Sequence, residues 1–129
     1  MSSSTYINLS KFEKAFQYHQ EYQYTYFITI TTNYKYGDTT PIIQKFKKYA
    51  YHHDENSHLM SVKEKTTKSH GPHYHILYFT NKKLKYAKFN KHMPPHSDIN
   101  IQLVPKTKSD IRNVVKYMQK NKTQNNQNI

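Results

Sequence analysis

Apolar and polar residues follow two different periods along this chain. Four segments are rich in aromatic and β-branched residues, alternating or in short apolar runs, which is typical of β-strands. Other segments repeat apolar residues every three to four positions, which is typical of amphipathic helices. The predicted strands cover residues 23–33, 58–66, 73–80 and 98–104, and the predicted helices cover residues 10–19, 40–51, 82–92 and a last segment capped by Ser109.

The order of these elements predicts the fold class. After the helix at residues 10–19, the order is β-α-β-β-α-β followed by one more helix. This is the order of an α+β, ferredoxin-like fold, in which an antiparallel sheet carries its helices on one face. Gly71 and Pro72 suit a chain reversal, so the second and third strands are expected to form an antiparallel hairpin. The added C-terminal helix carries Tyr117.

The composition narrows the classes of function. A length of 129 residues fits one ordinary domain. The formal net charge of +12 favours a polyanionic partner, with nucleic acid ahead of an anionic membrane surface. The sequence has no cysteine, which excludes disulfides, thiolate zinc sites and cysteine nucleophiles. Arg112 is the only arginine, so the bidentate recognition of guanine is mostly unavailable.

The two ends of the chain are polar and low in complexity. We therefore expect residues 1–8 and 122–129 to be disordered, with one domain over residues 9–121. No apolar run approaches the roughly 18 residues needed to span a membrane, and the polar start lacks the features of a signal peptide. These features predict a soluble, intracellular protein.

Two histidines stand two residues apart at the start of the third predicted strand. His73 and His75 project from the same face of such a strand, roughly 6.6 Å apart, and can bind one metal ion together. Glu64 lies opposite them in the predicted hairpin and can supply a third ligand. Such a set suits a divalent metal, Mg²⁺ or Mn²⁺, and less specifically Zn²⁺.

A phenol and a cation stand three residues apart in the last predicted helix. Tyr117 and Lys120 therefore share one helix face, beside the apolar stripe that packs on the core. A separate group of lysines in the 82–92 segment is a candidate ridge for binding the DNA backbone. It consists of Lys82, Lys83, Lys85 and Lys88, with Lys91 beyond them.

Each of these features also has an ordinary structural explanation. The two histidines fit a surface strand, and Glu64 fits an exposed partner of its neighbouring lysines. Tyr117 fits the rim of an amphipathic helix. The lysine ridge fits a solvated helix face equally well.

The combination of these motifs resembles the HUH superfamily of single-tyrosine Rep nucleases, the initiators of rolling-circle-type replication in small viruses and plasmids. The resemblance covers about residues 24–121. The segment FITITT is similar to the family's first motif, GPHYHILYF to its metal-binding HUH motif, and VVKYMQK to its YxxK motif. A free-standing domain of this size is most like the small Reps of rod-shaped archaeal viruses, some of which are dimers.

The resemblance implies an HUH endonuclease domain over residues 9–121, acting in the cytoplasm of the host cell. It implies that Glu64, His73 and His75 are the metal ligands, Tyr117 is the nucleophile and Lys120 is its cationic helper. The expected cofactor is Mg²⁺ or Mn²⁺. The expected partner is single-stranded DNA at a replication origin or genome terminus, and a homodimer stays open.

The expected chemistry is the nicking and joining of single-stranded DNA through a covalent 5′-phosphotyrosine. Three alternatives stay open. One is a single-tyrosine HUH transposase, whose polar amide at Tyr+4 is matched by Asn121. The second is a non-catalytic nucleic-acid-binding domain rich in Lys and Tyr. The third is a metal-dependent phosphodiesterase without a covalent intermediate.

Overall fold

The computed structural model describes residues 3–31, 42–64, 73–94 and 97–127, with side chains described over 11–31, 42–64, 73–94 and 97–119. Eight elements follow one another in the order that the sequence predicts. The strands are β1 (Tyr24–Thr31), β2 (His58–Glu64), β3 (His73–Thr80) and β4 (Asp98–Leu103). The helices are α1 (Ser3–Glu21), α2 (Ile42–His53), α3 (Tyr86–His92) and α4 (Lys108–Gln127).

The four strands form one antiparallel sheet in the order β2-β3-β1-β4. This is the strand order of a ferredoxin-like sheet, so the predicted α+β fold class is confirmed. The predicted hairpin is also present, because β2 pairs antiparallel with β3 and Glu64 faces His73 across it. The start of the helix predicted from residue 40 and the turn predicted at residues 71–72 lie outside the described residues.

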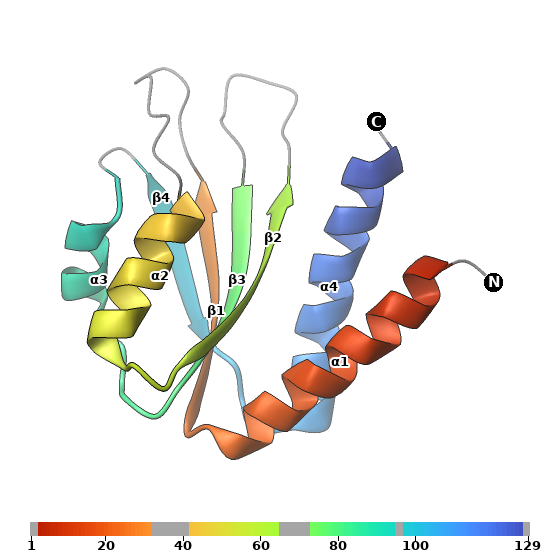
Figure 1. The fold of residues 1–129 in the computed structure, drawn as a ribbon, viewed down its shortest axis with the longest axis horizontal. Helices are drawn as coiled ribbons and strands as arrows, with labels where there is room; N and C mark the ends of the chain where they lie inside the picture. The colour runs from red at the N-terminus through yellow and green to blue at the C-terminus, as the bar shows by residue number, and fades with distance from the viewer. Residues whose placement is uncertain (1–2, 32–41, 65–72, 95–96, 128–129) are drawn as a thin grey trace.

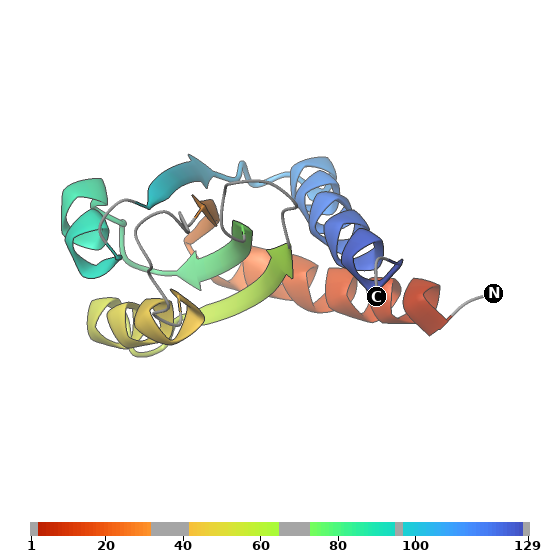
Figure 2. The same ribbon diagram turned by 90° about the horizontal axis from the view of Figure 1, so that it is seen from above.

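The sheet separates two layers of helices, as Figures 1 and 2 show. On β1, Tyr26, Ile28 and Ile30 are buried in a core with α2 and α3. Phe27, the alternate residue, faces the second core, which α1 and α4 cover. The twofold period of a strand thus assigns successive residues to different layers.

The second layer contains more than the predicted C-terminal helix. α1 packs beside α4, and Ala15 and Ile111 are fully buried in their shared core. His19 connects the end of α1 to β1 and to the segment before α4. Its Nδ1 lies 2.7 Å from Thr25 Oγ1 on β1, and its Nε2 lies 2.9 Å from the Pro105 carbonyl oxygen. The next residue adds a further contact, since Lys106 Nζ donates to the carbonyl of His19.

α3 is shorter than predicted, because it begins at Tyr86 rather than at Lys82. The backbone amides before it are taken by other partners. The amide of Asn81 donates to Asp54 Oδ2 at 3.0 Å, and that of Leu84 donates to the Tyr26 hydroxyl at 3.0 Å. These bonds connect the segment before α3 to Asp54 and to Tyr26 on β1.

The start of α4 also differs from the prediction. Thr107, not Ser109, caps the helix: its Oγ1 accepts the amide of Asp110 at 3.1 Å, and its carbonyl accepts the amide of Ile111. The hydroxyl of Thr107 donates to the Asp110 carboxylate in turn. Thr107 and Asp110 are thus joined by hydrogen bonds in both directions at the first turn of α4.

Both terminal helices extend into segments that we expected to be disordered. The backbone is helical from Ser3 in α1 and up to Gln127 in α4, whereas the prediction placed disorder at residues 1–8 and 122–129. Hydrophobic periodicity detects only the packed part of a helix, and a helix that has nucleated extends at little cost per residue. Among the described residues, no helix is both long and apolar enough to cross a membrane.

Candidate functional site

Glu64 and His75 meet on the sheet face that carries α4. Val62 is the direct cross-strand partner of His75, and Glu64 follows two residues later on the same face of β2. Glu64 Oε2 lies 3.1 Å from His75 Nε2. The His75 side chain is only 3% exposed and the Glu64 side chain is 27% exposed, so the contact sits where the buried core meets solvent.

His73 lies next to this pair without joining it. It is the Cα partner of Glu64 across the hairpin and shares the sheet face of His75, as the two-residue spacing requires. The imidazole rings of His73 and His75 are 6.4 Å apart between centroids. Within the parts of the chain that the structure describes, no three His, Asp or Glu side chains gather into a metal-binding cluster. Of the three predicted metal ligands, Glu64 and His75 are thus in contact and His73 lies close by.

Thr29 supports His75 from the other side. It is the cross-strand neighbour of His75 on β1, and its Oγ1 lies 3.2 Å from His75 Nδ1. His75 is therefore held by both ring nitrogens, one at Thr29 and one at Glu64. The sequence predicts a strand at residues 23–33 but no role for Thr29. The alternation of Thr29 and Thr31 with Ile28 and Ile30 was the available signal, since it places two hydroxyls on one sheet face.

Tyr117 lies over the same imidazole. It projects from α4, and its ring stands edge-on to that of His75 with 5.3 Å between centroids and 86° between planes. Phe27, another residue that sequence reasoning missed, stacks on His75 at 5.9 Å and meets the Tyr117 ring edge-on at 6.1 Å. Tyr117 keeps 49% of its surface exposed. The phenol therefore stays accessible from solvent while its ring is fixed beside His75.

Lys120 follows one turn later on α4, but its side chain lies outside the described residues. The predicted lysine ridge lies elsewhere. Lys82, Lys83, Lys85 and Lys88 line one pocket together with Tyr49, His52, His53 and His92. This pocket is formed by α2, α3 and the segment between β3 and α3, and it opens on the face opposite to Tyr117. The histidines among these residues had no predicted role.

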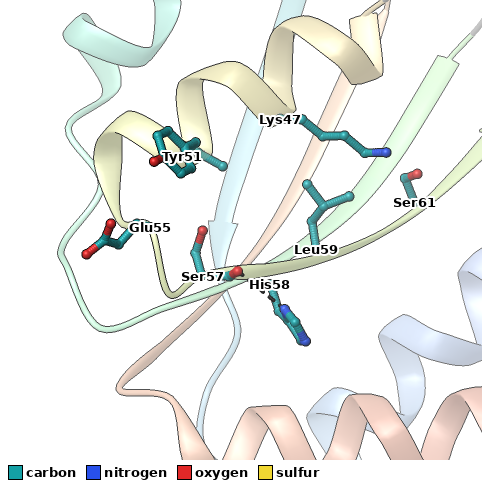
Figure 3. Close-up of a pocket in the computed structure, with 8 residues that line it drawn as sticks. Lys47, Tyr51, Glu55, Ser57, His58, Leu59 and Ser61 are labelled. Atoms are coloured by element: carbon teal, nitrogen blue, oxygen red, sulfur yellow. Dashed lines mark hydrogen bonds between the residues drawn. The ribbon is translucent and has the colours of Figure 1, made fainter.

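A different surface pocket of about 480 Å³ lies between α2 and the start of β2. Figure 3 shows Lys47 and Tyr51 reaching over it from α2, while His58 points away toward α1. Its described lining contains Lys47 and Glu55 but not Glu64, His73, His75 or Tyr117. It is therefore separate from the site around His75.

The comparisons with known proteins relate this chain to viral proteins. The chain is 64% identical over 110 residues to "Uncharacterized protein 117" of Sulfolobus islandicus rod-shaped virus 1, covering 85% of this chain and 94% of the relative. It is similar to the crystal structure of the hypothetical protein ORF119 from the same virus, with a TM-score of 0.74 and 61% identity over 85% of this chain and 92% of that chain. Residues 21–121 match the family described as "Virus, 117-like". This chain therefore belongs to the 117-like family of viral proteins.

Proposed function

We propose that this protein is a metal-dependent endonuclease and strand transferase of the HUH Rep type. It would nick and rejoin single-stranded DNA at an origin or terminus of a viral genome, in the cytoplasm of the host cell. Tyr117 would be the nucleophile and Lys120 its cationic helper. The proposal rests on the sequence motifs together with one observation in the structure.

That observation is the placement of Tyr117 beside His75. The two residues are 42 positions apart in the chain, and they come from the last helix and a central strand. Their rings are nevertheless in edge-to-face contact at 5.3 Å. A phosphate group that contacts the Glu64–His75 edge would lie within reach of the exposed phenol, which is the arrangement that in-line attack by a side-chain oxygen needs.

The atoms and electrons of the reaction balance without an oxidant, a reductant or ATP. Tyr117 Oη attacks the phosphorus, and the bond between phosphorus and the 3′ oxygen breaks. The 3′ oxygen leaves as a hydroxyl, taking up a proton equivalent to the one that the phenol gives up. The new phosphotyrosine bond retains the energy of the phosphodiester, so a 3′ hydroxyl can attack it in the reverse direction and join two strands without ATP.

The donor groups fit a divalent cation. Glu64 Oε2 and His75 Nε2 point at each other at 3.1 Å, and His73 shares their sheet face. Carboxylate oxygen with imidazole nitrogen is a donor set that Mn²⁺ and related divalent metals accept. Glu64, His73 and His75 would hold the ion, which supplies positive charge against the phosphate oxygens. Thr29 keeps the His75 ring oriented through Nδ1.

The test uses labelled single-stranded oligonucleotides that tile the ends and intergenic segments of the viral genome. With Mn²⁺ or Mg²⁺, the wild-type protein is expected to form an adduct with DNA that survives denaturation. Peptide mass mapping should place the adduct on Tyr117, and EDTA should prevent its formation. Adding an oligonucleotide with a free 3′ hydroxyl should yield a longer labelled strand.

Tyr117→Phe should abolish the adduct, and Tyr51→Phe is the matched control because Tyr51 is also exposed but lies on α2. An adduct on another tyrosine would reject Tyr117 as the nucleophile. Cleavage that persists in Tyr117→Phe without an adduct would identify a phosphodiesterase instead. DNA binding without cleavage of any oligonucleotide would identify a non-catalytic binding domain.

A further inference from the structure

A pocket of about 350 Å³ lies between the C-terminal turn of α2, the segment that follows β3, and α3. Its lining joins residues from three separate parts of the chain. Of the described residues that line it, four are lysines, three are histidines and the other is Tyr49. The lysines and histidines are Lys82, Lys83, Lys85, Lys88, His52, His53 and His92.

Among the residues that the structure describes, the lining contains no carboxylate that would neutralise its positive charge. Asp54 interacts electrostatically with Lys82, but it is buried and its oxygens accept Thr80 Oγ1 at 2.7 Å and the amide of Asn81 at 3.0 Å. The four lysine side chains are exposed at the rim. A site with this charge and no competing acid suits phosphate groups.

Hydrogen bonds fix the groups that form the floor and wall of the pocket. His53 Nε2 donates to the Lys83 carbonyl oxygen at 3.3 Å, and its Nδ1 lies 2.7 Å from the Tyr78 hydroxyl. His92 Nδ1 donates to the Lys88 carbonyl oxygen at 2.8 Å. These bonds join α2 and α3 to the segments that carry the lysines, so the positive charges are held on an ordered frame.

The pocket is remote from the site around His75. It lies on the α2 and α3 face, whereas Tyr117 lies on the α4 face. It is also at the other end of the strands, because it adjoins the end of β3 at Thr80 while His73 begins that strand (Figure 1). At about 3.4 Å per residue, the two ends of β3 are roughly 24 Å apart. A single phosphate therefore cannot contact both sites.

We propose that this pocket binds the phosphodiester backbone of a nucleic-acid strand, at a position outside the candidate reaction site. The volume exceeds that of one phosphate, and the lysines are spread along a segment and a helix rather than gathered around one point. Tyr86 is 53% exposed and follows Lys85 in the chain, so it offers a surface on which a base can stack. The proposal goes beyond strand cleavage and stands whether or not Tyr117 reacts.

The experiment measures equilibrium binding of a fluorescent 25-nucleotide single strand in the Tyr117→Phe background, so that no covalent step contributes. Lys85→Gln with Lys88→Gln is the pocket variant. Lys14→Gln with Lys47→Gln is the control, because it removes the same charge from exposed lysines outside the pocket. The pocket variant should bind roughly tenfold more weakly near 0.1 M salt, and the slope of log affinity against log salt should fall by about 1.4 for two lost contacts. The control should change affinity less than twofold.

Competition with tripolyphosphate separates a strand from a free phosphate compound. If tripolyphosphate binding is lost in the pocket variant while affinity for the 25-mer is unchanged, the pocket serves a small phosphate compound and the proposal is wrong. Equal losses in the two lysine pairs would also overturn it, because they would indicate diffuse charge rather than a site. Tyr86→Ala should weaken binding of the strand without changing binding of tripolyphosphate.

Discussion

The ring of Tyr117 stands edge-on to the imidazole of His75, with 5.3 Å between the two centroids. The contact uses the aromatic ring, so Tyr117→Phe should preserve it and change the free energy of unfolding by less than about 0.5 kcal/mol. Tyr117→Ala removes the contacts with both His75 and Phe27 and should cost about 1–2 kcal/mol. Urea denaturation followed by circular dichroism measures both. Equal destabilisation by Phe and Ala would show that the hydroxyl, not the ring, holds Tyr117 in place.

Thr29→Val tests the support of His75. Valine keeps the shape of threonine but removes the Oγ1 that lies 3.2 Å from His75 Nδ1. If His75 is a metal ligand, Mn²⁺ should bind roughly 10–100-fold more weakly, because partners of a ligand orient it and fix its tautomer. Calorimetric titration with Mn²⁺ measures the change. Unaltered Mn²⁺ affinity in a folded variant would mean that Thr29 does not position a ligand.

The site was predictable from sequence to the extent that strand periodicity fixes side-chain direction. The two-residue spacing of His73 and His75 and the centre of the hairpin were enough to place Glu64 on their face. The ring cluster with Phe27 was not predictable, because the packing angle between α4 and the sheet depends on the whole second core.

The boundaries of the elements were harder to predict for a related reason. The segment before α3 is held in part by Asp54, which lies 27 residues before Asn81 in the chain and accepts its amide. The pattern of neighbouring residues in the sequence gives no sign of a partner so far away in the chain. The sequence predicts the lysine ridge but not the histidines that line the pocket with it, since His52 and Lys88 are distant in sequence and only the packing of α2 on α3 brings them together.

Asp54→Asn should destabilise the protein by about 1–3 kcal/mol. The buried carboxylate accepts hydrogen bonds from the Thr80 hydroxyl and the Asn81 amide, and an asparagine side chain is a poorer acceptor for them. Burial alone would raise the pKa of Asp54, but hydrogen bonds from Thr80, Asn81 and Asn56 lower it below 3.8. A carboxyl group whose pKa is lower in the folded protein stabilises that protein at pH values above the pKa of the unfolded chain. This contribution is lost as the pH falls through the pKa of the folded protein. Denaturation curves should therefore show the difference between the wild-type protein and the Asp54→Asn variant shrinking below about pH 4. A difference that stays constant into the acid range would contradict this role.

His19 should make stability depend on pH in a higher range. Burial, opposed by the hydrogen bond to Pro105, lowers the pKa of His19 below 6.5, with the charge of Lys106 acting in the same direction as burial. The unfolded chain then binds the proton more tightly than the folded one. The contribution of His19 to stability is therefore fully present above pH 6.5 and is lost as the pH drops. Thermal unfolding between pH 7.5 and 5 should show this decline. His19→Gln should be less stable at pH 7.5 and should show a weaker dependence on pH, whereas an unchanged slope would assign the effect to other groups.

Phe46→Ala tests the core under α2. Phe46 is fully buried and meets Tyr78 and Phe89 edge-on. Truncation should cost about 3–5 kcal/mol by leaving a cavity that these rings cannot fill. Tyr51→Ala, on the exposed side of the same helix, should cost less than about 0.5 kcal/mol. Chemical denaturation compares the two, and a small loss for Phe46→Ala would mean that the helix readily collapses onto the sheet.

Successive residues of β3 point to opposite faces of the sheet. His73 and His75 lie on the face of α4, whereas Tyr74 and Ile76 lie on the face of α2 and α3. Inserting or deleting one residue within β3, between His75 and Ile76, would move both imidazoles to the face of α2 and α3 and Tyr74 to the face of α4. The strand therefore tolerates substitutions at single positions far better than any change in its length. Viral relatives that diverge in the hairpin should accordingly gain or lose residues in the turn and keep the phase of the strand.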